Sequence, residues 1–554
     1  MEKRKLDKKR ISQCAIIAFA FSFMINIFGP LEMYLSEKAE YLFSGKEFLS
    51  YCIVIFIVLG AALWGVMLIA DLIHSVFFKI ICALLMGIYI AGYIQGNYIV
   101  TNYGAMNGET IDWSQFRTEG IVSIVLWIAV IAIVLTAIFL IDNVKLLRAV
   151  TIVSICLVLI QISTVVTLLI QHDGLNKRPQ YIATTEGESS VSSDRNVIVF
   201  VLDTFDSDAM RNIIAGDTDG IYTGWMEDFT YYPDTLGAYP ATNLSIPLIL
   251  TGKSYMNEST YAQYVDEAFS SSELFTSMRS NGWNCGVYSS NLMPQDEDVV
   301  SGITNLRCHS RTVTSHKTLL KDVYKLVGIR YLPQMLKKYC WFDAEEFDII
   351  SVFDTDNGDV QFSWWNADFL SQIENVTADV TEPCFRFFHL EGTHTPFNTN
   401  ANLETDSSVE TTIEEEGQGC ILLMWLYCNK LKELGVYDNS TIVIMADHGY
   451  YGLRANPMLM LKEANESHEF AVDETKVSYY DIAEYLEVGI AGDSIKDKIA
   501  TNDKNNDVRY FRYNSNDLFI RADGYGDEIT EYYTNGNAWD EESFVLTDTI
   551  NDKE

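Results

Sequence analysis

Residues 196–206, which read NVIVFVLDTFD, decide the fold that we expect for this chain. Their first seven residues form an unbroken apolar run rich in β-branched side chains, which is typical of a strand buried on both faces of a parallel sheet. Two later runs have the same character, FRFFHL at 385–390 and TIVIMA at 441–446. The pattern predicts several central strands that are shielded from water on both sides.

Helical patterns occupy the stretches between the predicted strands. One covers 272–281 and precedes a short apolar run at 285–288, and another covers 420–434, just ahead of the third long run. Strands that alternate with helices favour an α/β fold with a mainly parallel central sheet.

Polar residues with metal-binding or phosphate-binding chemistry follow the long apolar runs. Asp203 comes directly after the first run, His394 shortly after the second, and Asp447 with His448 directly after the third. Ligand sites of open α/β sheets form beyond the carboxyl ends of the strands. Each residue alone has a plain explanation as a capping Asp or a core His, but their joint placement favours a functional site.

The loop 237–255, GAYPATNLSIPLILTGKSY, places hydroxyl groups before an apolar helical run. The structural interpretation is a capped helix, with Thr242 or Asn243 as the N-cap and Pro247 in the first turn. A helix N-terminus also offers free N–H groups and a positive dipole end to an anion. A Thr at that place, beside a metal ion, can be deprotonated and attack phosphorus.

Charge divides the chain into two unlike parts. Residues 1–171 hold 12 of the 39 Lys and Arg and 11 of the 75 Asp and Glu, so they carry +1 and the remainder carries −37. So acidic a domain repels nucleic acid, and it needs a local positive centre, such as a bound metal ion, to handle phosphate. The acidity by itself is also what a solvated surface shows.

Long apolar stretches in the first part predict five membrane-spanning helices, at 11–28, 49–70, 80–94, 121–141 and 149–170. A helix of about 20 residues crosses the apolar layer of a bilayer. The third stretch is the weakest, because Lys79 and Gln95 flank it closely. The first lacks a small-residue cleavage pattern, so we interpret it as a retained span and not as a signal peptide.

Basic residues beside the spans predict the orientation. Six Lys and Arg in MEKRKLDKKR precede the first span and indicate a cytoplasmic N-terminus. Lys145 and Arg148 lie in a predicted inner loop, whereas Arg117 is the only basic residue of the predicted outer loop 96–120. Five crossings place the chain from residue 172 onward outside. We therefore expect a multi-pass protein of the bacterial cell membrane with an extracytoplasmic domain.

These patterns predict four regions along the chain. Residues 1–171 form the five-span membrane domain, and 172–195, rich in Ser, Thr and Glu, form an exposed polar tether. Residues 196–500 form the α/β domain, and 501–554 form a terminal subdomain with a strand at 510–514.

Several motifs, in this order, resemble those of the alkaline phosphatase and sulfatase superfamily. They are LDTFD at 202–206, ATNLSIPLILTGK at 241–253, HLEGTHTPF at 389–397, ADHG at 446–449 and VSYYDIAEYL at 477–486. The resemblance covers residues 196–486 and implies an alkaline-phosphatase-like α/β domain that is catalytic.

The loop around Thr242 distinguishes groups within that superfamily. Aligned on Thr251 and Gly252, Thr242 falls where sulfatases carry the Cys or Ser that becomes formylglycine, so sulfate-ester hydrolysis is not expected. A Thr nucleophile after five spans instead resembles lipoteichoic acid synthases and phosphoethanolamine transferases. The spacing T-x-x-S-[IV]-P is closer to the transferases. The absence of a His between His448 and His468 indicates a single metal ion and is closer to the synthases.

The resemblance also implies roles for individual residues. One divalent metal ion would be held by Asp203, Thr242, Asp447 and His448, and Thr242 would carry a covalent phosphoryl group. His394 would hold the substrate phosphate or assist proton transfer, and Arg454 is a candidate phosphate contact. Carboxylate, hydroxyl and imidazole ligands suit Mn²⁺, which we favour, as well as Zn²⁺ or Mg²⁺. The first ligand is Asp here and Glu in those transferases.

The expected reaction is transfer of a phosphoglycerol-type group from a membrane phospholipid to a cell-envelope polymer or lipid through a phosphothreonine. The alternatives are a phosphoethanolamine transferase, and a metal-dependent phosphodiesterase or phosphatase of the same superfamily. A sulfatase and a non-catalytic envelope-binding protein are the remaining ones. Among residues near the motifs, Asp206 and Asp208 are expected to cap a helix, and Trp364 and Trp365 to pack in the core.

Overall fold

The computed structural model divides the chain into two compact units. Unit 1 comprises Met1–Pro179 and Ser310–Asp354, and unit 2 comprises Gln180–His309 and Thr355–Glu554. The residues described are 8–36, 38, 41, 43–101, 103, 106, 111–141, 143–172, 174–177, 179–291, 293–342, 346–353, 358–405, 411–503, 508–514 and 529–550.

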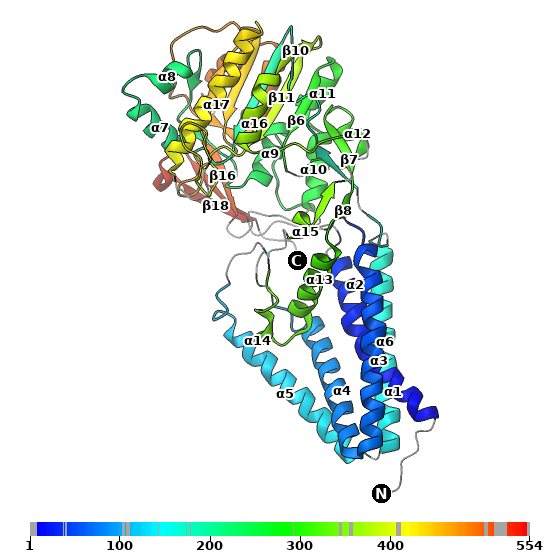
Figure 1. Ribbon diagram of the computed structural model, residues 1–554. Coiled ribbons are helices and arrows are strands. Elements are labelled where there is room, and N and C mark those ends of the chain that lie inside the picture. Colours follow the sequence, from blue (N-terminus) through cyan, green and yellow to red (C-terminus); the bar gives the residue numbers. More distant parts are fainter. Residues whose placement is uncertain are drawn as a thin grey trace. The chain divides into compact units, whose positions relative to one another are not determined.

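Unit 1 contains the five expected apolar helices, each long enough to cross a membrane (Figure 1). The first runs through α1 (Lys8–Phe23), a π-helical turn (Met24–Phe28) and α2 (Gly29–Ser36). The others are α3 (Lys46–Ile73), α4 (Ser75–Tyr98), α5 (Arg117–Leu140) and α6 (Asn143–Gln171).

The outer faces of these helices are apolar. Five of their aliphatic side chains, Ile57, Val58, Ile128, Ile133 and Leu159, are 52–68% exposed. Contact of so much apolar surface with water is unfavourable, whereas contact with lipid is not. The helices therefore have the composition of a membrane anchor. The basic N-terminal residues 1–7, used above to predict orientation, lie outside the described residues.

A segment from the middle of the chain belongs to unit 1. It comprises β8 (Arg311–Val313), α13 (His316–Tyr331), α14 (Gln334–Lys337), α15 (Glu346–Ile349) and β9 (Ser351–Phe353). Leu319, Val323 and Leu326 of α13 are buried in the same core cluster as side chains of the membrane helices. The sequence pattern predicts one uninterrupted domain over 196–500, whereas in the structure residues 310–354 of that range belong to unit 1. The physical reason is that the apolar face of α13 packs into the core of the membrane helices.

Unit 2 is built on a seven-stranded sheet with the order β14-β4-β13-β12-β3-β11-β6. Its parallel part comprises β6 (Asn284–Tyr288), β11 (Cys384–Leu390), β3 (Asn196–Leu202) and β12 (Ser440–Met445). Antiparallel pairing then adds β13 (Leu459–Lys462) and β4 (Thr230–Tyr231), and β14 (Ala471–Val472) pairs in parallel with β4. The mainly parallel central sheet that the sequence predicts is confirmed.

Helices and aromatic side chains cover the buried strands. The rings of Phe200, Phe388 and Tyr288 stack across β3, β11 and β6, with centroids 5.3 and 4.9 Å apart. Phe369 of α16 (Asn366–Gln372) and Tyr427 of α17 (Ile413–Glu433) pack edge-on against Phe200. Helix α18 (Ile482–Ala491) also packs against β3, next to α9 (Thr242–Thr251) and α11 (Glu273–Ser280). Aromatic packing therefore holds the central strands rigidly in register.

Part of the expected tether is folded. Within 172–195, β1 (Gln180–Ala183) pairs with β7 (Leu306–His309), and β2 (Ser190–Ser192) pairs with β10 (Thr377–Val380). The backbone of this polar stretch thus forms ladder hydrogen bonds, which its composition did not indicate.

The C-terminal residues form a small antiparallel sheet of β16 (Arg509–Asn514), β17 (Ile529–Thr534) and β18 (Val545–Ile550). β16 agrees with the strand predicted at 510–514. The remaining elements of unit 2 are short: α7 (Ser207–Gly216), α8 (Ile221–Trp225), β5 (Thr235–Leu236), α10 (Tyr261–Ser270), α12 (Glu297–Val300), β15 (Val477–Ser478) and α19 (Ile495–Asn502).

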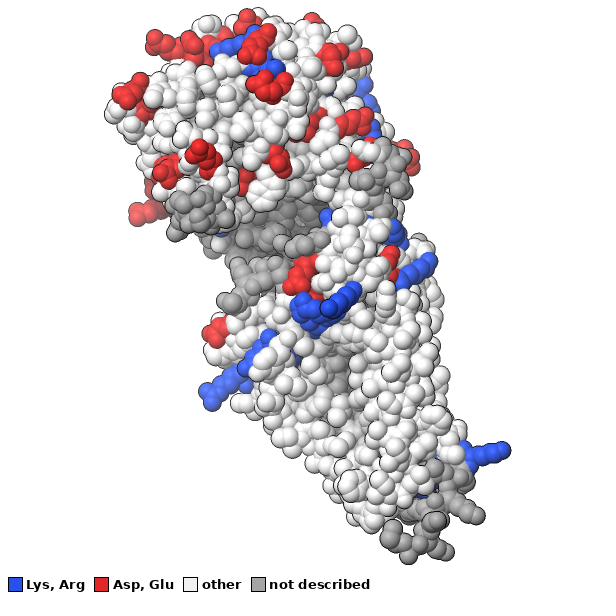
Figure 2. Space-filling model, in the orientation of Figure 1, with Lys and Arg blue, Asp and Glu red and all other residues white. Residues whose placement is uncertain are grey.

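Acidic side chains are spread over the surface of unit 2 that Figure 2 shows. Since they are scattered and not gathered into one patch on this face, a solvated surface explains much of the acidity of unit 2.

Candidate metal and nucleophile site

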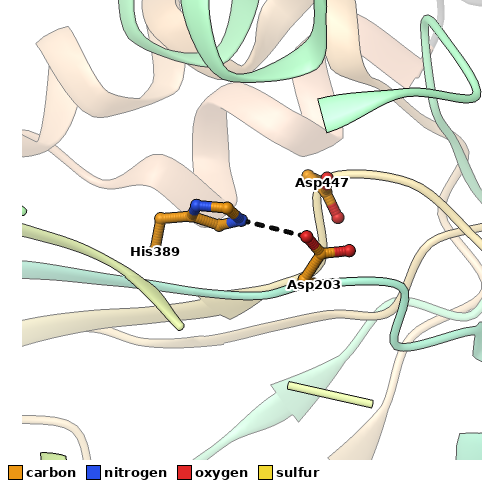
Figure 3. Close-up of side chains that lie close together, drawn as sticks. All are labelled: Asp203, His389 and Asp447. Atoms are coloured by element: carbon orange, nitrogen blue, oxygen red, sulfur yellow. Dashed lines mark ion pairs between the residues drawn. The ribbon is translucent and has the colours of Figure 1, made fainter. Parts of the chain in front are cut away.

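The carboxyl ends of three neighbouring strands bring three ionisable side chains together. Asp203 directly follows β3, His389 is the last residue but one of β11, and Asp447 follows β12 by two residues. One ligand atom from each lies within 4.8 Å of the others, and all three side chains are buried. The imidazole Nε2 of His389 is 3.3 Å from Asp203 Oδ2 (Figure 3). The strand order therefore assembles the cluster.

His448 is oriented for metal binding. Its Nε2 lies 3.4 Å from Asp447 Oδ2 and 3.9 Å from Asp203 Oδ1. On the other side of the ring, Nδ1 lies 2.8 Å from the carbonyl oxygen of Gly449 and donates to it in the neutral tautomer. That bond leaves the Nε2 lone pair facing the two carboxylates, as a metal-ligating histidine requires.

Asp203 is held as a carboxylate. Burial alone would raise its pKa, but the close contact with His389 and the electrostatic effect of the imidazoles of His448, His389 and His394 outweigh burial and bring the pKa below its ordinary value. A backbone contact holds the neighbouring carboxylate, because Thr204 N donates to Asp447 Oδ1 at 3.1 Å. Asp203 thus remains available as an anionic ligand.

Thr242 begins α9 and points to this cluster. Its Oγ1 is 3.3 Å from Asp203 Oδ2, and the hydroxyl donates to that oxygen. The N-cap of α9 is Ala241, and no side chain caps the helix. The expectation that Thr242 or Asn243 caps the helix is therefore wrong, and the Thr242 hydroxyl is turned to the carboxylate.

Pro247 lies in the sixth position of α9, beyond the first turn. Because Pro has no N–H, the carbonyl of Asn243 lacks its helical donor. Tyr261 Oη donates to that carbonyl instead, at 2.5 Å. This contact steadies the turn that presents Thr242.

The residues fit a divalent cation. Oδ2 of Asp447 is buried and has no hydrogen-bond partner among the described residues. A buried, unpaired carboxylate oxygen beside a second carboxylate is costly unless a cation neutralises the pair. Hydroxyl and imidazole groups complete a hard to borderline set of ligands. The site therefore has the chemistry of a metal centre, as the sequence predicts in coarse form.

The turn after β11 is closely fitted to Asp203. Gly392 has φ of +61°, and a Cβ added there would lie 2.3 Å from the Asp203 nitrogen. Asp203 N donates to Leu390 O at 3.1 Å, and Thr393 N donates to Asp203 O at 2.9 Å. Only glycine allows this approach, so the turn fixes the backbone of the first candidate ligand.

Asp206 organises the loop that follows His448. Its Oδ1 caps α7 by accepting from Asp208 N at 2.7 Å, as predicted. Its Oδ2 accepts from Tyr450 N at 2.8 Å and Tyr451 N at 3.1 Å. Asp208 itself pairs with Arg211. Asp206 therefore supports the site from outside the candidate ligand set.

His394 lies beside the cluster and outside the group of three ligands. It is exposed, and its ring packs edge-on against Trp364 with centroids 5.5 Å apart. The Trp364 ring is also 6.1 Å from the His389 ring, so this partly buried residue contacts both histidines. Trp365 is largely exposed, and the expectation that it packs in the core was wrong because its ring turns outward.

Arg454 contributes backbone hydrogen bonds to the loop that follows His448. Its φ is +61°, its carbonyl accepts from Gly449 N at 2.9 Å, and its N–H donates to Tyr451 O at 2.8 Å. With the described residues its side chain forms no hydrogen bond or ion pair. A phosphate-binding role for Arg454 stays a prediction.

His389 is the site residue that the sequence pattern did not single out. It lies within the motif HLEGTHTPF, where the pattern favours His394 because that residue follows the strand. A histidine inside a fully buried strand was the available signal, because such a group needs a polar partner.

No family model and no curated protein matches the sequence. Ps i-CgsB, solved with k-i-k-neocarrahexaose, is 14% identical over 64% of this chain and 86% of that chain, with a TM-score of 0.39. The lipoteichoic acid synthase LtaP from Listeria monocytogenes is 12% identical over 64% and 86%, with a TM-score of 0.33. A protein in the alkaline phosphatase superfamily from Vibrio parahaemolyticus is 10% identical over 66% and 84%, with a TM-score of 0.32.

Proposed function

We propose that the protein is an enzyme that transfers a phosphoglycerol-type group from a membrane phospholipid to a cell-envelope acceptor. The 3.3 Å separation between Thr242 Oγ1 and Asp203 Oδ2 carries the proposal. A helix-terminal hydroxyl that is not used as a cap, and that points into a buried Asp/His cluster, has the placement of an activated nucleophile.

In the proposed first step, Thr242 Oγ attacks the phosphorus of a phospholipid diester. The Oγ–P bond forms, the bond from phosphorus to the diacylglycerol oxygen breaks, and the threonine proton is lost. The leaving oxygen takes up one proton, which yields diacylglycerol and a phosphothreonine whose phosphate still carries the glycerol headgroup. In the second step an acceptor hydroxyl displaces the Thr242 oxygen and gives up its proton, and Thr242 is regenerated.

Four residues would hold a metal ion: Asp203, Thr242, Asp447 and His448. His389 would either join them or fix Asp203 through their 3.3 Å contact. When bound, a divalent ion supplies a lower pKa for the Thr242 hydroxyl and positive charge for the phosphate. We propose Mn²⁺ first and Zn²⁺ or Mg²⁺ as alternatives, since all three accept oxygen and imidazole ligands.

Other groups of the site have supporting roles in the proposal. The first N–H groups of α9 and the Arg454 guanidinium bind phosphate oxygens. The exposed imidazole of His394 binds phosphate or gives the leaving oxygen its proton. The proposal includes the orientation of the protein in the bacterial cell membrane. The N-terminus lies in the cytoplasm and unit 2 lies outside, where donor lipids and envelope acceptors are found.

The test uses the full-length protein in detergent with fluorescent phosphatidylglycerol and Mn²⁺, and release of fluorescent diacylglycerol is followed. Thr242→Ala is expected to lower the rate by roughly a thousandfold or more, as loss of a nucleophile does. Thr242→Ser retains a hydroxyl and is expected to keep part of the activity. The matched control is Thr251→Ala at the other end of α9, where the hydroxyl donates to Pro247 O and accepts from Lys253 N. This variant should keep most of the activity.

Each outcome decides between the candidate reactions. Diacylglycerol release that survives Thr242→Ala, or excess chelator, contradicts the nucleophile and metal assignments. Release from phosphatidylethanolamine alone favours a phosphoethanolamine transferase. If free glycerol phosphate accumulates in the presence of envelope acceptors, the enzyme is a phosphodiesterase. No release from any lipid, by a folded protein that binds Mn²⁺, contradicts a lipid donor.

A further inference from the structure

A buried lysine in unit 1 has no carboxylate partner among the residues that the structure describes. Lys337, the last residue of α14, is 2% exposed, and none of the described carboxylates lies within ion-pair distance of its ammonium group. Burial and the positive charge of Arg330 lower the pKa of Lys337 to about 8. Arg330 is already paired, because its guanidinium is 3.2 Å from Glu32. A buried ammonium group is costly unless an anion compensates its charge.

One aromatic ring lies beside this lysine, and further rings pack around that ring. The Tyr103 ring lies 5.4 Å from the Lys337 ammonium group. Around Tyr103, with centroids 5.0–6.3 Å away, lie Trp113, Phe116 and Trp341. Trp and Tyr with Lys or Arg concentrate where a membrane protein meets the lipid headgroups.

Contacts of the neighbouring residues place Lys337 and the aromatic rings around Tyr103 at one end of the helix bundle. In α14, Gln334 accepts from Tyr103 and its N–H donates to Ser123 near the start of α5. At α13, Arg330 and Tyr331 bind Glu32 of α2, and α2 packs against α6. The start of α5 and the end of the first span both belong to the side of the bundle that the proposed topology places outside.

Basic side chains and exposed apolar side chains occur together in the segment around Lys337. Residues 311–338 contain seven Lys and Arg against one Asp, in a chain with a net charge of −36. Figure 2 shows Lys and Arg side chains gathered on the part of unit 1 that Figure 1 labels α13. Lys338 is exposed beside Lys337, and Met335, Leu336 and Tyr339 are 40–73% exposed. Ammonium groups beside exposed apolar side chains suit a ligand with a phosphate head and acyl chains.

We propose that Lys337 and Lys338, with the aromatic group around Tyr103, form a binding site for the headgroup of an anionic phospholipid in the bilayer. The phosphate would lie between the two ammonium groups, and the acyl chains would lie along Met335 and Leu336. This site lies in unit 1 and is separate from the Asp203 cluster. The proposal relies on the membrane location of the helices and not on the reaction of Thr242.

The test measures lipid binding by the full-length protein in detergent, with a chelator present so that no lipid is consumed. Phosphatidylglycerol and phosphatidylcholine are offered in equal amounts, and retained lipid is counted by native mass spectrometry. The wild type is expected to prefer phosphatidylglycerol. Lys337→Gln and Lys338→Gln should each weaken that binding about fivefold, the effect of one basic side chain near a headgroup.

Lys317→Gln is the matched control, because Lys317 is an exposed lysine on the same segment, in the first turn of α13. It is expected to leave binding unchanged, although it removes the same charge. Lys338 is exposed, so its replacement should not disturb folding; the unfolding temperature checks this for Lys337→Gln.

Three results would overturn the proposal. They are unchanged phosphatidylglycerol binding in both test variants, an equal loss in Lys317→Gln, and equal retention of phosphatidylcholine. Displacement of the lipid by free glycerol phosphate at the same concentration would assign the site to a soluble anion and overturn the lipid assignment. Because the readout is bound lipid, a failure of diacylglycerol release in the earlier test leaves this result unaffected.

Discussion

At the scale of single residues, the contacts of the candidate site converge on Asp203. Its carboxylate lies 3.3 Å from Thr242 Oγ1, 3.3 Å from His389 Nε2 and 3.9 Å from His448 Nε2. The neighbouring imidazoles lower the pKa of Asp203 despite its burial. One side chain thus links the candidate nucleophile to the candidate metal ligands.

His389→Gln tests the residue that the sequence pattern did not single out. Loss of a ligand, or of the partner that orients one, is expected to weaken Mn²⁺ binding roughly 10- to 100-fold. Isothermal titration of the full-length protein measures this. His468→Gln is the control, because His468 pairs with Glu466 at 2.9 Å and lies outside the cluster. Equal Mn²⁺ affinity in wild type and His389→Gln would contradict the assignment.

Glu416 predicts a pH dependence of stability. Burial raises its pKa from 4.5 to about 7, although Asn398 N and Thr399 N donate to it. Because the folded-state pKa lies above the unfolded value, the stabilising contribution is complete below pH 4.5 and is lost as pH rises through about 7. The full difference is roughly 3 kcal/mol.

Unfolding temperatures measured between pH 4.5 and 8 test this slope. Glu416→Gln, a neutral isostere that still accepts both N–H groups, is expected to flatten it and to stabilise the protein at pH 8. Glu433→Gln is the control, since Glu433 is exposed at the far end of the same helix. An unchanged slope in Glu416→Gln would show that other groups cause it.

At the scale of elements, the turn between β11 and the following loop has the strictest backbone requirement of the site. Gly392→Ala places a Cβ 2.3 Å from the Asp203 nitrogen, at a φ of +61°. We expect a loss of about 2 kcal/mol or more, together with weaker metal binding, because Asp203 must move. Denaturant unfolding and Mn²⁺ titration measure the two effects.

Gly224→Ala provides the comparison for that experiment. Gly224 lies in α8, and an added Cβ there meets nothing within 4 Å. Ala in a helix is expected to be neutral or stabilising by up to about 1 kcal/mol. If both variants unfold at the same denaturant concentration, the close contact at Gly392 does not matter for stability.

At the scale of the whole molecule, the C-terminal sheet is tied to the loop that leads into α9. Arg509 is fully buried; it donates to Asp234 Oδ1 and Asp234 O at 2.7 Å, and to Gly536 O at 2.9 Å. Arg512 N donates to Ala238 O at 2.8 Å, a few residues before Thr242. The terminal subdomain therefore supports the segment that presents the candidate nucleophile.

Arg509→Met is expected to destabilise unit 2 by about 3–5 kcal/mol, because it leaves the buried carboxylate of Asp234 unpaired. Urea unfolding followed by tryptophan fluorescence measures the change. Lys498→Met breaks a more exposed pair with Glu484 and should cost less than about 1 kcal/mol. Similar midpoints for both variants would contradict a structural role of the Arg509 pair.

The sequence by itself determined the features that depend on local pattern. The apolar runs predicted β3, β11 and β12 to within a residue at either end, because a strand buried on both faces must be apolar throughout. The five apolar helices followed from their length and composition. Asp203, Asp447 and His448 were singled out as candidates because the ends of strands converge in α/β folds, and Thr242 because it stands at a helix start. Their roles stay a prediction.

Tertiary structure alone decided the features that depend on residues far apart in the chain. The assignment of residues 310–354 to unit 1 rests on the packing of α13 against the membrane helices, and a helical period does not reveal its partner. His389 became a site residue only when β11 paired with β3. The strands within 172–195 likewise needed partners more than 100 residues away. Local sequence fixes what a segment can form, whereas the choice among possible partners is made by packing and hydrogen bonding across the folded chain.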